Sequence, residues 1–155
     1  MITQKYNKSE LYDRVVERHG IFENSYDFMV FLAVMGYREN RRITSEYLGN
    51  DGMSGEIGVD NLKKNELYRT VMACLAFQET NDPTALVNER KQAKILAQYA
   101  AGGLEIAEQE FGTVAGDPTD AVVNYIRSAQ DEDINPSGEL GKIVSSFDEE
   151  MMQDN

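Results

Sequence analysis

The sequence predicts a mainly α-helical protein, with one compact helical domain of about five helices. The strongest observation is the stretch Tyr26–Tyr37, in which every residue from Phe28 to Met35 is apolar. A helix that is apolar on all sides should be surrounded by other elements, and this one is far shorter than the roughly 20 apolar residues that span a bilayer. We therefore predict a central core helix, in which Phe31→Asp would bury an unpaired charge and prevent folding.

The second observation is helical periodicity in four further segments, at residues 9–18, 65–79, 85–111 and 120–129. Ser9 is a favourable N-cap for the first of these, and Ser25 is placed to cap the central helix. The patterns are typical of amphipathic helices that pack around one core.

The helix at 65–79 is expected to bury one face, made of Leu67, Val71, Cys74, Leu75 and Gln78 and widened by Tyr68, Met72 and Ala76. Cys74 lies in an apolar run and is predicted to be a buried structural thiol. As it is the only cysteine, no internal disulfide can form, which fits a reducing cytosol.

Two features suggest departures from simple helices. Residues 43–48 and 56–59 are compatible with short strands, so a small β-hairpin is expected near 43–59. Gly102 and Gly103 each cost roughly 1 kcal/mol relative to Ala inside a helix. We expect this pair to mark a kink or the close approach of another helix, because no phosphate-binding pattern flanks it.

Charged residues are distributed unevenly along the chain. The formal net charge is −12, which opposes general coating of DNA but leaves room for a local basic patch. Residues 131–155 contain eight acidic residues and one lysine. This composition predicts a helical domain at 1–130 followed by an acidic, flexible tail at 131–155.

No pattern of catalytic, cofactor-binding or metal-binding residues is found. His19 is the only histidine, and its position at a helix end favours a capping or surface role. Zinc-ligand spacings, Walker A and GxGxxG motifs are absent. The acidic run Asp131–Asp133 lacks EF-hand spacing and is interpreted as solvated. No signal peptide or lipidation motif is seen, so we expect a cytoplasmic protein without a cofactor.

One basic cluster follows the central helix: Arg38, Arg41 and Arg42. Arginines at a helix C-terminus complement the helix dipole and often form intramolecular ion pairs. They also suit bidentate contact with a carboxylate or phosphate of a partner. Both interpretations stay open, and the alternative intramolecular partner for the same arginines is the acidic tail folded back onto them.

Three motifs carry a resemblance to a known family: FMVFLAVMGYRENRR, QYAAGGLEIAEQEF and DPTDAVVNYI. Together they resemble the Dnd system-associated protein 4 family, encoded beside DNA phosphorothioation (Dnd) gene clusters. The likeness covers about Tyr6 to Ile126. It implies a bacterial or archaeal accessory factor of systems that mark DNA or restrict foreign DNA, and it transfers no catalytic residue. The most motif-like positions are Phe31, Gly36, Tyr37, Arg38, Asn40, Arg41, Arg42, Gly102, Gly103, Leu104 and Glu105.

The function predicted from these observations is a non-catalytic accessory subunit of a prokaryotic defence system that acts through contacts with other proteins of that system. The alternatives are an acidic DNA mimic or antitoxin-like inhibitor, and a carboxylate-metal nuclease. DNA contact is expected only through a local basic patch or a partner, and no membrane contact is expected. The predicted partner-binding residues are Tyr37, Arg38, Arg41 and Arg42, with Gly102 and Gly103 nearby.

Overall fold

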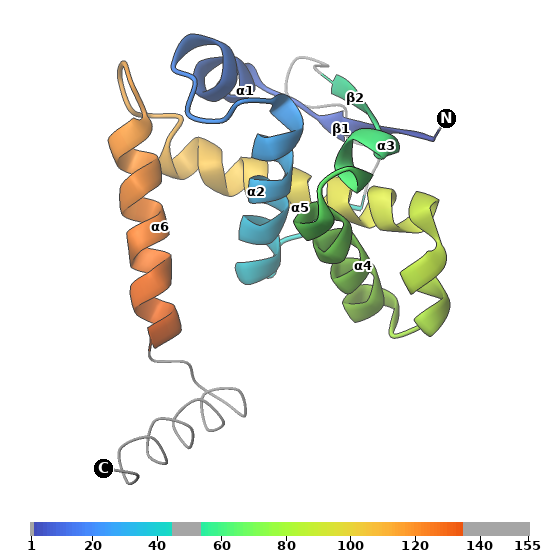
Figure 1. Ribbon diagram of the computed structural model, residues 1–155. Helices are drawn as coiled ribbons and strands as arrows, with labels where there is room; N and C mark the ends of the chain where they lie inside the picture. Colours follow the sequence, from blue (N-terminus) through green and yellow to red (C-terminus); the bar gives the residue numbers. More distant parts are fainter. Residues whose placement is uncertain (1, 45–53, 135–155) are drawn as a thin grey trace, which may run out of the picture. The chain divides into compact units, whose positions relative to one another are not determined.

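The computed structural model describes residues 2–44 and 54–134 and is mainly α-helical, as predicted (Figure 1). The chain divides into two compact units, Met1–Thr119 and Asp120–Asn155. In chain order the elements are β1 (Thr3–Asn7), α1 (Glu10–Tyr12), η1 (Asp13–Arg18), α2 (Ser25–Arg38), β2 (Ser54–Gly58), α3 (Val59–Lys63), α4 (Glu66–Thr80), η3 (Pro83–Val87), α5 (Glu89–Glu110) and α6 (Thr119–Ile134). Here η1 is a π-helical segment and η3 a 3₁₀ turn.

The core of the first unit forms where α2 and α4 pack on α5 (Figure 1). The 22-residue α5 is buried along most of its length, through residues such as Leu96 and Ala107. From α2, Phe28, Met29 and Leu32 are fully buried against it. Phe28 also packs edge-on to Tyr12, with ring centroids 4.8 Å apart. The predicted central helix is therefore confirmed as a core element.

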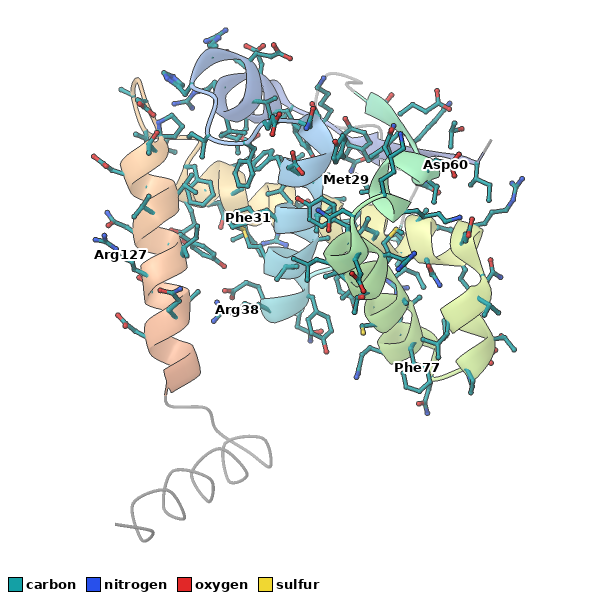
Figure 2. All side chains as sticks on the ribbon, in the orientation of Figure 1. Met29, Phe31, Arg38, Asp60, Phe77 and Arg127 are labelled. Atoms are coloured by element: carbon teal, nitrogen blue, oxygen red, sulfur yellow. The ribbon has the colours of Figure 1, made fainter. Side chains whose placement is uncertain are left out.

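The expectation that α2 is surrounded on all sides is wrong at one strip of its surface. Val34 is 39% exposed, and Phe31 is half-buried beside Phe22, with ring centroids 5.2 Å apart. Figure 2 shows Met29 and Phe31 on different sides of the helix. A folded surface is partly apolar, so a wholly apolar run does not require burial all round. Phe28 and Leu32 are therefore more sensitive core positions than Phe31.

A small antiparallel sheet exists, but its pairing differs from the predicted hairpin. β2 includes most of the second predicted strand, and its partner is β1, with Thr3 opposite Gly58 and Asn7 opposite Ser54. Residues 43 and 44 have no regular structure, and 45–53 lie outside the described residues. Long-range pairing of this kind leaves no local turn signal, unlike a hairpin.

All five predicted helices are present, with two additions and shifted ends. The first begins with the predicted cap, because Ser9 Oγ accepts a hydrogen bond from the Leu11 amide. Asn24, rather than Ser25, caps α2 through a capping box with Asp27. The sequence missed the short α3, and the first residues of the helix predicted at 85–111 belong to the separate η3. The last helix, expected to end at residue 129, continues to Ile134, past the composition change at 131. The predicted acidic tail falls mainly on residues 135–155, outside the described part of the chain.

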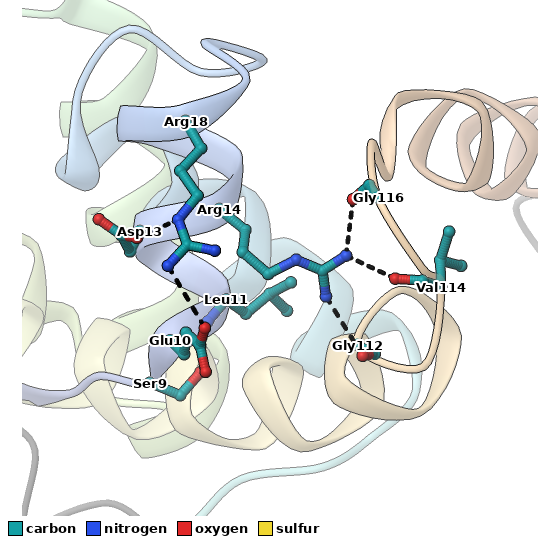
Figure 3. A network of polar contacts seen from close by, with 9 residues as sticks. All are labelled: Ser9, Glu10, Leu11, Asp13, Arg14, Arg18, Gly112, Val114 and Gly116. Carbon is teal, nitrogen blue, oxygen red and sulfur yellow. Dashed lines mark hydrogen bonds and ion pairs between the residues drawn. The ribbon is translucent and has the colours of Figure 1, made fainter.

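A network around Arg14 ties η1 to the segment that follows α5 (Figure 3). The Arg14 guanidinium donates hydrogen bonds to the carbonyl oxygens of Gly112, Val114 and Gly116, at 3.2, 2.6 and 2.9 Å. Beside it, Arg18 pairs with Asp13 at 2.9 Å and Glu10 at 3.5 Å. Arg14 thus satisfies three carbonyls of an irregular turn that has few backbone partners of its own.

Candidate functional site

The predicted basic cluster begins at the C-terminus of α2. Tyr37 and Arg38 form its last turn, and Asn40 takes the left-handed conformation, with φ of 54°. The Arg41 amide then donates to the Gly36 carbonyl at 2.8 Å, which closes the helix end. From there the chain crosses α5, where the Ile43 amide donates to the Gln98 carbonyl at 3.1 Å.

The glycines of the predicted site hold α2 and α5 close together. A Cβ on Gly103 would overlap the Leu32 carbonyl, and one on Gly102 would overlap the Arg41 carbonyl. Gly36 meets α5 from the other side, since its Cβ would overlap the Tyr99 carbonyl and lie 2.9 Å from the Gly103 nitrogen. α5 continues as one helix through both glycines. Of the two expectations, close helix packing is the one that these contacts support.

Arg41 forms an ion pair on the surface of this junction. Its Nη2 atom lies 2.6 Å from Oε2 of Glu105, and both side chains are a little under half exposed, at 45% and 43%. Exposed ion pairs of this kind contribute roughly 0–1 kcal/mol. Glu105 thus orients the Arg41 side chain. A partner that displaced this ion pair would lose little free energy by doing so.

Arg42 is held more firmly, by a side-chain network that joins α4 and α5. Its Nη1 atom lies 2.5 Å from Oε2 of Glu79, and its guanidinium carbon lies 5.9 Å from the ring centroid of Tyr99. The Tyr99 hydroxyl donates a hydrogen bond to Glu79. Burial and this hydrogen bond raise the pKa of Tyr99 to about 12. Tyr37 packs edge-on to Tyr99, with ring centroids 5.7 Å apart.

The structure therefore brings Tyr37, Arg42 and Tyr99 together and places Gly102 beneath Arg41. Arg41 and Arg42 form the intramolecular ion pairs that one of the two interpretations expected. Tyr37, 42% exposed, and Arg38 lie at the surface. The sequence missed Glu79 and Tyr99 as members of the cluster. Tyr99 stood in the motif QYAAGGLEIAEQEF, but of the partners described here only Glu105 was among the most motif-like positions. Whether these residues bind a partner stays a prediction.

The outer face of α4 corrects another expectation. Its buried residues are Met72, Leu75 and Ala76, whereas Leu67 is 66% exposed and Cys74 is exposed. The prediction of Cys74 as a buried thiol is wrong, as is the choice of Leu67, Cys74 and Gln78 for the core face. The helix carries apolar residues on two sides, and periodicity alone could not tell which side meets α5.

His19 lies at the surface directly after η1, and its Nδ1 atom is 3.9 Å from Asp117. Across residues 2–44 and 54–134, no three His, Cys, Asp or Glu side chains gather closely enough to hold a metal ion. None of the helices that the structure describes is long and apolar enough to cross a membrane.

The model of the family described as DNA sulphur modification system-associated protein 4 matches residues 2–145. Neither a curated protein nor a solved structure matches the chain. The match covers nearly the whole chain, including the α2–α5 junction and its arginines. The chain belongs to the DNA sulphur modification system-associated protein 4 family.

Proposed function

We propose that this protein is a non-catalytic accessory subunit of a prokaryotic DNA-phosphorothioation-linked or related anti-phage defence system, and that it acts through contacts with other proteins of that system. The family description supports the association with DNA sulphur modification. The observation that carries the proposed mode of action is the outer face of α4.

That face is exposed and uncharged. From Thr70 to Gln78 the helix contains no charged residue, although 27% of the whole chain is charged. Leu67, Cys74 and Gln78 are exposed and Val71 is half-buried, and these four recur at spacings of four, three and four residues. Single exposed apolar residues are ordinary, but a continuous stripe without charge is typical of the centre of a protein interface.

The end of this stripe lies beside the predicted basic cluster. Glu79, in the last turn of α4, holds Arg42, and both contact Tyr99, on which Tyr37 packs. We define the α2–α4 surface by Tyr37 and Arg38 from α2 and by Leu67, Val71, Cys74 and Gln78 from α4. Tyrosine and arginine are common anchors in such interfaces. Arg41 and Arg42 support this surface, and a partner carboxylate would have to compete with Glu105 and Glu79 for them.

Co-expression with the DNA sulphur modification proteins of the same host tests the proposal. The tagged chain is expected to co-purify with at least one of them. Leu67→Glu should abolish this capture, because it places a charge on the exposed apolar stripe of the surface, and the melting temperature should stay unchanged. Gln109→Glu is the matched control, since Gln109 is also exposed and gains the same charge on α5. Equal capture by the two variants, or no capture by the wild type, would refute the proposal.

The competing nuclease function needs its own measurement. We expect plasmid DNA to stay intact when it is incubated with the pure protein and Mg²⁺ or Mn²⁺. Cleavage that disappears when one defined pair of carboxylates is replaced by amides would establish an enzyme and overturn the non-catalytic assignment.

A further inference from the structure

A second surface forms around η3, where two large apolar side chains face solvent. Leu86 is 48% exposed and Val87 is 83% exposed. The turn is nevertheless firmly built. The Asp82 carboxylate accepts from the Thr84 amide at 3.0 Å, and the buried Gln92 side chain donates to the Ala85 carbonyl at 2.8 Å. The exposure of Leu86 and Val87 therefore belongs to an ordered turn and not to a frayed end.

Positive charge adjoins this turn at the start of α5. Arg90, Lys91 and Lys94 are exposed, and none of the three forms an ion pair with a residue that the structure describes. The nearest acid in sequence, Glu89, is bound by Lys63 at 2.7 Å. These cations thus differ from Arg41 and Arg42, which form ion pairs with Glu105 and Glu79. Lys91 has a weaker electrostatic interaction with Asp82, outside ion-pair distance.

The chain segment around the η3 turn also carries a net positive charge. Between residues 60 and 94, six basic residues outnumber five acidic ones, while the whole chain has a formal net charge of −12. An acidic partner can therefore approach this part of the protein with less repulsion than the net charge of the whole chain suggests.

A shallow hollow connects the apolar and basic parts. It has a volume of about 520 Å³ and is lined by Ile2, Thr84, Val87, Asn88, Glu89 and Arg90. Ile2 is fixed there because its carbonyl accepts from the Val59 amide at 2.9 Å. The lining of the hollow therefore combines the apolar Ile2 and Val87 with Arg90 and with Glu89, whose charge is matched by Lys63.

We propose that this η3 surface, defined by Leu86, Val87, Arg90, Lys91 and Lys94, binds an acidic protein segment that carries an apolar side chain. The apolar side chain enters the hollow against Ile2 and Val87, and the flanking carboxylates meet Arg90 and Lys91. Arginine presents a planar fork that matches a carboxylate in bidentate fashion. The charge of the segment is complementary to these cations, and its apolar side chain covers surface that would otherwise face water.

The exposed apolar side chains of the η3 surface favour a protein over a nucleic acid as its partner. A phosphodiester backbone offers negative charge but no apolar group to cover Leu86 and Val87, and the rest of this chain repels it. An acidic peptide supplies both the negative charge and an apolar side chain. The η3 surface is distinct from the α2–α4 surface, so the proposal goes beyond the function proposed above and does not depend on it.

Fluorescence anisotropy with the purified full chain tests the idea. The first probe is a labelled peptide of glutamates around one leucine. The second peptide has serine in place of the leucine, and the third probe is a DNA duplex. The leucine peptide is expected to bind at least about tenfold more tightly than either of the others, because only it fits both halves of the surface. Equal binding of the two peptides would refute the apolar hollow, and equal or tighter binding of the duplex would refute a protein partner.

Three variants locate the binding. Arg90→Glu should weaken the leucine peptide at least about tenfold, and Val87→Ser should remove the difference between the two peptides. Arg127→Glu on α6 is the control with the same charge change at an exposed arginine, and it should alter affinity less than about threefold. Lys94→Glu replaces Arg90→Glu if the latter fails to fold. Equal effects at positions 90 and 127 would refute the site. The assay contains no other protein, so failed co-purification leaves its outcome unchanged.

Discussion

Gly103 of α5 lies so close to the backbone carbonyl of Leu32 in α2 that no side-chain carbon fits between them. Gly102 and Gly36 repeat this relationship on either side of it, against the carbonyls of Arg41 and Tyr99. In each case the obstacle is backbone, which cannot rotate away as a side chain can. The distance between α2 and α5, and hence the position of the arginines beyond α2, depends on these three glycines.

The first prediction concerns this contact. Gly103→Ala would gain about 1 kcal/mol in helix propensity. The clash with Leu32 should cost more, so we expect a net loss of about 1–3 kcal/mol in the free energy of unfolding. Urea denaturation followed by far-UV circular dichroism measures it. Gln109→Ala, at an exposed position of the same helix, should change stability by less than about 0.5 kcal/mol. A Gly103→Ala protein as stable as the wild type would mean that the helices are further apart.

The second prediction uses two buried tyrosines. The Tyr12 hydroxyl is buried and has no hydrogen-bond partner in the described part of the chain, whereas the Tyr99 hydroxyl donates to Glu79. Tyr12→Phe removes an unsatisfied group, so stability should stay the same or rise by about 1 kcal/mol. Tyr99→Phe should lower it by about 1–2 kcal/mol. Thermal melts of both variants test the difference, and a large loss in Tyr12→Phe would reveal a partner for that hydroxyl.

The third prediction is a loss of stability in alkali. The pKa of Tyr99 rises from 10.0 to about 12 on folding, because burial and the bond to Glu79 disfavour the phenolate. Below pH 10 the group is neutral in both states, so this contribution is fully present. Between pH 10 and about 12 only the unfolded chain releases the proton, so stability falls across this range. Tyr99→Phe should make the decline shallower in denaturation series at increasing pH; an identical slope would contradict the assignment.

The fourth prediction follows from the exposure of Cys74. A thiol reagent such as Ellman's reagent should modify it in the native protein, without denaturant, at a rate close to that of the unfolded chain. Cys74→Ser should change the free energy of unfolding by less than about 0.5 kcal/mol, as expected of a surface substitution. Protection of the thiol until the protein unfolds would restore the interpretation of a buried residue, or would show that another chain covers the α2–α4 surface.

The fifth prediction compares two neighbouring arginines of Figure 3. Arg14→Ala leaves three carbonyl oxygens without their donor, and we expect a loss of about 2–3 kcal/mol. Arg18→Ala removes only exposed ion pairs with Asp13 and Glu10, worth less than about 1 kcal/mol. Both are measured by urea denaturation. Equal losses would show that the segment from Gly112 to Gly116 does not depend on Arg14.

The sequence by itself determined the longer helices of this protein and its charge. Apolar spacing within α2 and α5, and the Ser9 cap of the first helix, are local properties, since a helix is formed by residues three and four positions apart. The motifs around Arg38 and Gly102 also carried the correct family resemblance.

The tertiary structure decided which face of each helix is buried and which charges are matched. The pairing of β1 with β2 and of Arg42 with Glu79 joins residues far apart in the chain, and one sequence contains no local record of such contacts. For α4, apolar residues occupy two sides, and only the position of α5 selected Met72 and Leu75 over Leu67 and Cys74. The same selection left Arg90 and Lys91 exposed beside Val87, because burial and ion pairing are decided by neighbours in space rather than in sequence.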